Sequence, residues 1–224
     1  MQSSTIKTRI KAILNELNRV YGEPVWRDPL PPIDELVSTI LSQNTNDVNR
    51  DRAFHALRQR FPTWDEVRQA PEEEIIDAVR IAGLANQKGP RIKQVLNQIQ
   101  AELGALDLSF LGDIPLEDAR AWLLRFNGVG PKTAAIVLQF SLGRPAFPVD
   151  THVYRVTGRL GVRPLNLNVE KTHQLMEELI DPADYFAGHL NLIRLGREIC
   201  HPRKPECPRC PVNQLCDYPD KTIA

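Results

Sequence analysis

The sequence predicts an all-α protein, and two observations carry that prediction. Apolar residues recur at spacings of three and four along most of the chain, as they do on one face of a helix. Proline and glycine separate these segments, and the alternating pattern of strands is nearly absent. The 224 residues, 42% of them hydrophobic and 25% charged, suffice for one or two globular domains.

The first half of the chain contains a series of amphipathic segments. The first predicted helix runs from Ile6 to Val20 and ends near Gly22 and Pro24, which stop a helix. Pro31 and Pro32 then begin the next one. Further helices are expected at 33–41, 46–57, 64–69, 72–81 and 90–103.

The second half begins with two helices joined by a very short turn. They are expected at 117–126 and 131–142, with only Asn127 to Gly130 between them. Helices at 151–160, 169–180 and 183–199 complete the series. The proline-rich turns at 29–32 and 144–148 are the best candidates for crossings between domains.

Composition excludes two classes of protein. No apolar run approaches the ~18–20 residues of a membrane-spanning helix, and the hydrophobic content is too high for a disordered chain. The first ten residues, MQSSTIKTRI, have no apolar core of a signal peptide. We therefore expect a cytoplasmic protein without a membrane partner, whose cysteines stay reduced.

The charge is neutral in total but unevenly distributed. There are 28 basic and 28 acidic residues, yet the segment between Asp118 and Glu170 contains seven basic residues and one acidic residue, Asp150. This segregation predicts a basic surface suited to a polyanion. Charged helix faces sorted by chance would give the same pattern.

The four cysteines of the chain crowd together near its end. Cys200, Cys207, Cys210 and Cys216 have the spacing C-x6-C-x2-C-x5-C, which predicts a four-thiolate metal site. Structural zinc usually has two C-x2-C knuckles, whereas only Cys207 and Cys210 form one here. We therefore favour an iron–sulfur cluster over a zinc ion, and either over unligated cysteines.

The turn between the helices at 117–126 and 131–142 reads Asn127-Gly128-Val129-Gly130. Glycines at both positions permit positive φ and a close approach of backbone N–H groups to an anion. Pro131 suits the first position of the next helix, whose N-terminus favours phosphate. The pattern indicates a helix-hairpin-helix that binds a nucleic-acid backbone, although a plain interhelix turn would look the same.

Lys132 and Asp150 are the candidate catalytic pair. Lys132 lies in the first turn of its helix, where the helix dipole and neighbouring cations disfavour the protonated amine and so favour a nucleophile. Asp150 should stay ionised and could stabilise positive charge developing on a sugar. It is equally well placed to cap the helix that begins at Thr151, and the two roles are compatible.

Together these motifs resemble the endonuclease III family of base-excision repair DNA glycosylases. The resemblance rests on LRFNGVGPKTA at 124–134, PVDTHVYR at 148–155 and the four-cysteine loop, and it extends from Ile33 to Cys216. It implies two helical domains with a cleft between them. One is a six-helix domain over 33–143 that ends in the hairpin, and the other combines 1–32 with 144–224 around a [4Fe–4S] cluster.

The resemblance also implies roles for individual residues. Lys132 and Asp150 fall on the catalytic lysine and aspartate, and the four cysteines fall on the cluster ligands. Either Gln43 or Asn44 would fill the gap left by a flipped base. The remaining residues expected to contact DNA are Gly128, Val129 and Gly130 of the hairpin, and Arg203 and Lys204 of the cysteine loop.

The implied activity is that of a monomeric, bifunctional glycosylase and abasic-site lyase, acting on oxidised pyrimidines in damaged double-stranded DNA. Two alternatives remain open at this point. The first is a monofunctional mismatch or adenine glycosylase, in which water attacks instead of lysine. The second is a non-catalytic DNA-binding module that uses the hairpin as a clamp.

Overall fold

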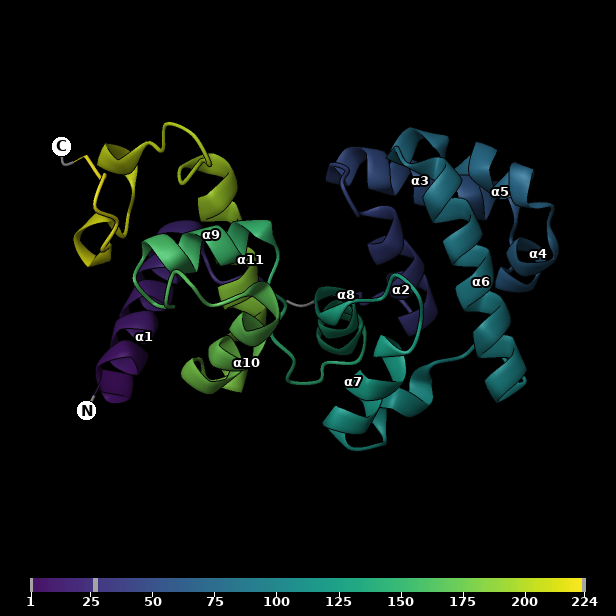
Figure 1. The fold of residues 1–224 in the computed structure, drawn as a ribbon, viewed down its shortest axis with the longest axis horizontal. Helices are drawn as coiled ribbons and strands as arrows, with labels where there is room; N and C mark the ends of the chain where they lie inside the picture. Colours follow the sequence, from purple (N-terminus) through teal and green to yellow (C-terminus); the bar gives the residue numbers. More distant parts are fainter. Residues whose placement is uncertain (1, 26–27, 223–224) are drawn as a thin grey trace. The chain divides into compact units, whose positions relative to one another are not determined.

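A computed structural model describes residues 2–25 and 28–222 of the chain, and within them it contains helices and turns but no strand (Figure 1). The all-α fold predicted from the sequence is therefore confirmed. The chain divides into two compact units, one formed by Met1–Asp28 together with Pro145–Ala224 and the other by Pro29–Arg144. Among the described residues, no helix has both the length and the apolar character needed to cross a membrane.

The discontinuous unit is built from one N-terminal helix and three C-terminal ones. Helix α1 packs against α10 and α11, and α9 packs against α11. Their apolar stripes form one buried core that includes Leu17, Val153, Met176 and Leu192, each 0% exposed. The bounds of these helices are α1 Gln2–Tyr21, α9 Thr151–Arg159, α10 Val169–Leu179 and α11 Tyr185–Glu198.

The cysteine segment follows α11 and is anchored on α1. Arg9 of α1 donates to the carbonyl of Leu215 through Nε at 3.1 Å and Nη2 at 2.7 Å. The same guanidinium forms an ion pair with Asp217. Asn191 of α11 adds a 2.8 Å hydrogen bond to Asn18 of α1. These contacts join the N-terminal helix to the C-terminal segment within one compact unit.

The continuous unit contains the remaining helices and ends with the hairpin region. Helix α2 packs against α3 and α8, α5 packs against α6, and α7 packs against α8. The last residues of α8 pass into a π-helical turn, Val137–Ser141. The bounds are α2 Pro32–Leu41, α3 Asp47–Arg60, α4 Trp64–Gln69, α5 Glu72–Ala78, α6 Ala85–Leu103, α7 Leu116–Leu124 and α8 Pro131–Ile136.

Helix α6 begins five residues earlier than the sequence predicts. Gly89 and Pro90 suggested a helix start at Pro90, but both lie inside α6. A Cβ at Gly89 would lie 2.8 Å from Cγ1 of Ile76, so this glycine permits α5 to pack closely on α6. Pro90 removes one backbone hydrogen bond near the helix start, a cost that the packing of α6 outweighs.

Most of the clustered arginines do not form the basic surface predicted from their spacing. Arg144 donates to the carbonyls of Leu111 at 3.0 Å and Ile114 at 2.9 Å. Arg163, only 7% exposed, donates to the carbonyl of Tyr154 at 3.0 Å. Arg155 and Arg159 likewise donate to backbone carbonyls. Local charge counted along the chain therefore overstates the charge available to a ligand.

Candidate functional site

The hairpin between α7 and α8 has the geometry of a tight turn that presents a helix start. Gly128 adopts φ +82°, which is strained for other residues, and the Val129 N–H donates to the carbonyl of Phe126 at 3.0 Å. Gly130 is the residue before the helix, and Pro131 is its first residue. Lys132 follows directly, so the candidate nucleophile stands in the first turn of α8.

Gly130 differs from the expectation of a positive φ. Its φ is −95° and its ψ is 179°, an extended conformation that any residue adopts. A Cβ added there would meet no atom of the chain within 4 Å. Neither backbone conformation nor packing within the chain explains this glycine, whereas close approach of a ligand to its backbone would.

Two side chains tie the hairpin to the turn that follows α2. Gln43 Nε2 donates to the Gly128 carbonyl at 3.0 Å, and Gln43 Oε1 accepts from Arg91 Nη1 at 2.8 Å. A Cβ on Gly128 would lie 2.1 Å from Arg91 Nε, so the arginine packs against the bare glycine backbone. Both ends of the Gln43 amide are therefore used inside the protein.

Asn44, the next residue, is placed differently. It is exposed and has φ +52°, a conformation that asparagine tolerates better than most residues. Gln43 and Asn44 are the two candidates for filling the space of a flipped base. The amide of Gln43 is held by Arg91 and Gly128, so Asn44 is the better candidate. The sequence alone left this choice open.

A buried lysine links the same turn to a second one. Lys88 of α6 is 1% exposed, and its Nζ donates to the carbonyls of Leu41 at 2.8 Å and Ala82 at 2.7 Å. Burial lowers its pKa to about 8. Lys88 and Arg91, one turn apart on α6, therefore position the turns after α2, before α6 and before α8.

Leu84 is a candidate contact residue that the sequence did not single out. It is 46% exposed, has φ +51° and stands immediately before α6. A positive φ costs a leucine conformational free energy, and residues held in such conformations cluster at functional sites. Insertion between bases is one function that an exposed apolar side chain can serve. The available signal was a large apolar residue beside Gly83 and outside the apolar stripe of α6.

Lys132 has an acidic neighbour on α2. Burial raises the pKa of the Glu35 carboxyl, while the hydrogen bond from Thr39 and the charges of Arg50 and Lys132 oppose the rise. The Thr39 hydroxyl donates to Glu35 Oε1 at 3.2 Å. The amine of the candidate nucleophile therefore lies within electrostatic range of a half-buried carboxyl group.

Asp150 lies in the other unit and has the capping role predicted for it. Its Oδ1 accepts from the Val153 N–H at 2.7 Å, so it is the N-cap of α9. The side chain is half-buried. The cap accounts for its place at the helix start, and a catalytic role remains a prediction.

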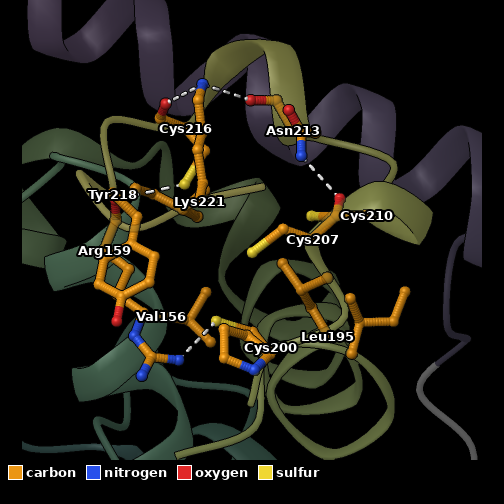
Figure 2. Close-up of a pocket in the computed structure, with 13 residues that line it drawn as sticks. Val156, Arg159, Leu195, Cys200, Cys207, Cys210, Asn213, Cys216, Tyr218 and Lys221 are labelled. Carbon is orange, nitrogen blue, oxygen red and sulfur yellow. Dashed lines mark hydrogen bonds between the residues drawn. The ribbon is translucent and has the colours of Figure 1, made fainter. Parts of the chain in front are cut away.

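The four cysteines lie around one pocket of the discontinuous unit (Figure 2). None forms a disulfide. Apolar side chains of α9 and α11, among them Val156 and Leu195, form part of the lining, and Arg159 Nη1 donates to Cys200 Sγ at 3.5 Å. Lys221 and Asn213 hold the carbonyls of the loop, Lys221 donating to Cys216 at 2.6 Å.

This donor set fits a soft metal. All four donors are sulfur, the pocket is otherwise largely apolar, and burial raises the pKa of the Cys210 thiol to about 11. Thiols that bind metal must lose their protons, which the positive charge of the metal favours. Across the described part of the chain, no three His, Cys, Asp or Glu side chains converge as they would around a single metal ion.

Arg203 and Lys204 project from the same loop. Both are exposed, and Lys204 has φ +54°. Unlike Arg155 and Arg159, neither is engaged with the carbonyls that hold the loop. They are therefore basic groups available to an anionic partner.

Comparison with known proteins places these features in a family. The family model for HhH-GPD superfamily base excision DNA repair proteins matches residues 37–182. Endonuclease III of Thermotoga maritima is 34% identical over 189 residues, which are 84% of this chain and 83% of that protein. An Arabidopsis thaliana relative is 43% identical over 141 residues, which are 63% of this chain but only 48% of the plant protein, about half its length.

A solved structure is similar over nearly the whole chain. The structure of a trapped endonuclease III–DNA covalent intermediate has a TM-score of 0.80 and 27% sequence identity. The match covers 95% of this chain and 96% of that one. The fold of this chain is therefore shared with a protein whose structure was solved with DNA.

Proposed function

The chain belongs to the HhH-GPD superfamily of base excision DNA repair proteins and, within it, to the endonuclease III family, and we propose that it is a bifunctional DNA glycosylase and abasic-site lyase. The proposed substrate is damaged double-stranded DNA carrying oxidised pyrimidines, and the protein acts as a monomer. The observation that carries the proposal is the position of Lys132 in the first turn of α8, directly after the hairpin.

Recognition begins with the DNA backbone. Gly130, which has no reason inside the chain to be glycine, allows a phosphate to approach the N-terminus of α8. Arg203 and Lys204 add charge from the cysteine loop. Contacts of this kind fix the register of the protein on DNA without reading the base sequence.

The damaged base must leave the helix before chemistry starts. Extrusion costs a few kcal/mol, and less for a poorly stacked base. Leu84, exposed and strained, is suited to wedge between bases, while Asn44 fills the vacated position with polar groups. The hydrogen bonds of Gln43 and Lys88 hold the turns that carry these two residues.

Chemistry then takes place at the sugar. The neutral Lys132 amine attacks C1′, and the base departs with the electrons of the glycosidic bond and takes up a proton. The sugar ring then opens: the C1′–O4′ bond breaks, O4′ takes up a proton released by the attached amine, and a protonated imine joins Lys132 to C1′. This protonated imine acidifies the C2′ proton. Loss of that proton breaks the C3′–O bond by β-elimination, so that the strand is cut on the 3′ side.

Asp150 supplies charge rather than a bond. A carboxylate beside the sugar stabilises the oxocarbenium character that develops as the base leaves. Its capping bond to Val153 fixes the side chain at the start of α9. Stabilisation of this kind needs a carboxylate that does not have to reorient during the reaction.

We assign a [4Fe–4S] cluster to the cysteine pocket. Cys200, Cys207, Cys210 and Cys216 would each ligate one iron, as such clusters require. Four sulfur donors from one loop and an apolar lining support this choice. The cluster would fix the loop that carries Arg203 and Lys204, and no step of base excision passes through it.

Borohydride trapping tests the proposed activity. A duplex with one oxidised pyrimidine should give a covalent protein–DNA complex with the wild type and none with Lys132→Gln, because only the lysine mechanism forms a reducible imine. A monofunctional glycosylase would release the base without a trapped complex. A non-catalytic binding module would bind the duplex and leave it intact, and either outcome would overturn the proposal.

A further inference from the structure

The short segment that leads into Asp150 is held by two side chains of α10, one of them buried. The Phe147 N–H donates to Glu177 Oε1 at 2.8 Å, and the Phe147 carbonyl accepts from His173 Nδ1 at 3.0 Å. His173 is 3% exposed, and Phe147 is fully buried. Both backbone polar groups of Phe147 are thus satisfied by side chains from a single helix.

Helix α11 adds a second histidine. His189, 2% exposed, lies 2.9 Å through Nδ1 from the carbonyl of Pro148. Its ring also packs edge-on against Phe147, with the centroids 6.0 Å apart and the planes at 89°. Because a carbonyl oxygen only accepts hydrogen bonds, the Nδ1 atoms of both histidines carry the protons in these contacts.

The choice of histidine at these two positions is informative. Apolar side chains would fill the core of this unit at least as well, but they would leave two buried carbonyls without donors. A buried carbonyl without a donor is unfavourable, because it has lost its hydrogen bond to water. Two histidines on different helices therefore fix the path of consecutive residues, with only the buried Val149 between them and Asp150.

We infer that His173 and His189 are positioning residues for the Asp150 carboxylate. The inference rests on the proposed function. The capping bond orients Asp150 relative to α9, whereas the two histidines hold the carbonyls of Phe147 and Pro148, which precede the cap. A displacement of about 1 Å in a catalytic group can cost about 10²-fold in rate. The hydrogen bonds of His173 and His189 therefore affect the rate of the reaction as well as the stability of the fold.

The test uses substitutions that separate the hydrogen bond from the ring. Asn places an amide N–H near the position of histidine Nδ1, whereas Gln places it near Nε2 and Leu supplies none. We expect His173→Leu and His189→Leu to lower single-turnover base excision at least about 10-fold. The Asn variants should recover most of that loss, and the Gln variants should not. If a Leu variant does not fold, the Asn and Gln pair still decides the question.

Two further readouts distinguish positioning from general destabilisation. On a duplex with a preformed abasic site the base has already left, so β-elimination by the same variants should change less than about 3-fold. In an Asp150→Asn background the loss caused by His173→Gln should nearly vanish, because both changes act through one carboxylate. The positioning role would be overturned if the variants lost as much rate in β-elimination as in base excision. It would also be overturned if His173→Gln caused its full loss of excision rate in the Asp150→Asn background.

The proposed function can fail separately. A wild-type protein that neither excises a base nor forms a trapped complex would refute the glycosylase itself, and this inference with it. If the wild-type protein is active and both Gln variants excise the base at the wild-type rate, the proposed glycosylase stands. Only the positioning role of His173 and His189 is then refuted.

Discussion

Gln43 Nε2 donates a 3.0 Å hydrogen bond to the carbonyl of Gly128, a residue 85 positions further along the chain. Arg91 completes the contact by donating to the other end of the same amide. The turn after α2 and the hairpin before α8 are therefore held together. In the proposed function one turn fills the space of the flipped base and the other binds phosphate, so this contact sets their spacing.

The two glycines of the hairpin should respond differently to alanine. Gly128→Ala forces a side chain into positive φ and against Arg91, and it should lower the free energy of unfolding by about 1–2 kcal/mol. Gly130→Ala meets no atom of the chain and should melt like the wild type. Its affinity for undamaged duplex should still fall about 10-fold, the value of one backbone N–H bond to a charged group. If Gly130→Ala binds duplex DNA as tightly as the wild type, no phosphate contacts the backbone at this position.

Asn44 and Gln43 should separate function from stability. Asn44→Gly should melt normally, because glycine adopts the positive φ of this position freely. It should lower excision from a duplex about 10-fold, because nothing then compensates the vacated base position. The same variant should match the wild type on a single-stranded substrate, which has no such gap. Gln43→Ala should instead lose about 1 kcal/mol of stability, since the Gly128 carbonyl and Arg91 lose their partner. Equal losses of Asn44→Gly on single- and double-stranded substrates would assign the role to another residue.

The local parts of the fold were predictable from the sequence. The bounds of α4 match the prediction, Trp64 to Gln69, because Thr63 forms a capping box with Glu66 that the sequence displays. Helix α8 begins at Pro131 as predicted, since proline suits a first helical position. The predicted start of α6 was wrong because Gly89 lies inside the helix, where it allows close contact with Ile76. No local sequence pattern reveals that contact.

Long-range partners account for the rest. Periodicity cannot show that Arg144 is occupied by carbonyls some 30 residues earlier, nor that Gln43 reaches Gly128. Motifs make Lys132, Asp150 and the cysteines candidates, because their proposed chemistry needs those residue types at fixed spacing. Supporting residues such as Lys88, Arg91, His173 and His189 have no such signature, because many side chains can donate a hydrogen bond to a carbonyl.

Lys88 should make stability depend on pH in the alkaline range. Its pKa in the folded protein, about 8, lies below the 10.5 of an exposed lysine. Between these values the unfolded chain binds more protons, so stability rises with pH, is fully present above about pH 10.5 and is lost as pH falls through 8. A neutral amine also has two N–H donors for its two carbonyl acceptors.

The Lys88 effect can be isolated by comparison with Lys88→Met. Urea unfolding at pH 8 and pH 10 should show a gain of about 1–2 kcal/mol in the wild type beyond the change in the variant. The comparison of pH slopes cancels other titrating groups and the lost hydrogen bonds. Parallel slopes for the two proteins would show that Lys88 keeps its proton in the folded state throughout this range.

The cysteine pocket makes a prediction about composition. Anaerobically purified protein should contain about four irons and an equal amount of acid-labile sulfide per chain, measured by elemental analysis and sulfide assay. Replacing Cys210 with Ser should lower the iron content, whereas replacing His201, which lies beside a ligand, with Asn should not. One tightly bound zinc without sulfide would refute the cluster and leave the DNA-binding argument untouched.

Asp150 permits the sharpest separation of a structural from a catalytic role. Asn and Asp are nearly equivalent as N-caps, so Asp150→Asn should keep the bond to Val153 and melt like the wild type. Asp150→Ala should lose about 1 kcal/mol with the cap. A carboxylate that only caps would be replaced by asparagine without loss of excision.

If the charge of Asp150 stabilises the oxocarbenium, Asp150→Asn should instead lower the single-turnover excision rate by about 10² or more, the scale of one electrostatic group. Lys132→Gln is the companion control, and it should bind damaged duplex while giving no borohydride-trapped complex. Because Asn preserves shape, hydrogen bonding and helix cap, a lost rate at unchanged melting temperature can come only from the missing charge. Excision at the wild-type rate would remove Asp150 from the catalytic residues and leave Lys132 as the only one supported.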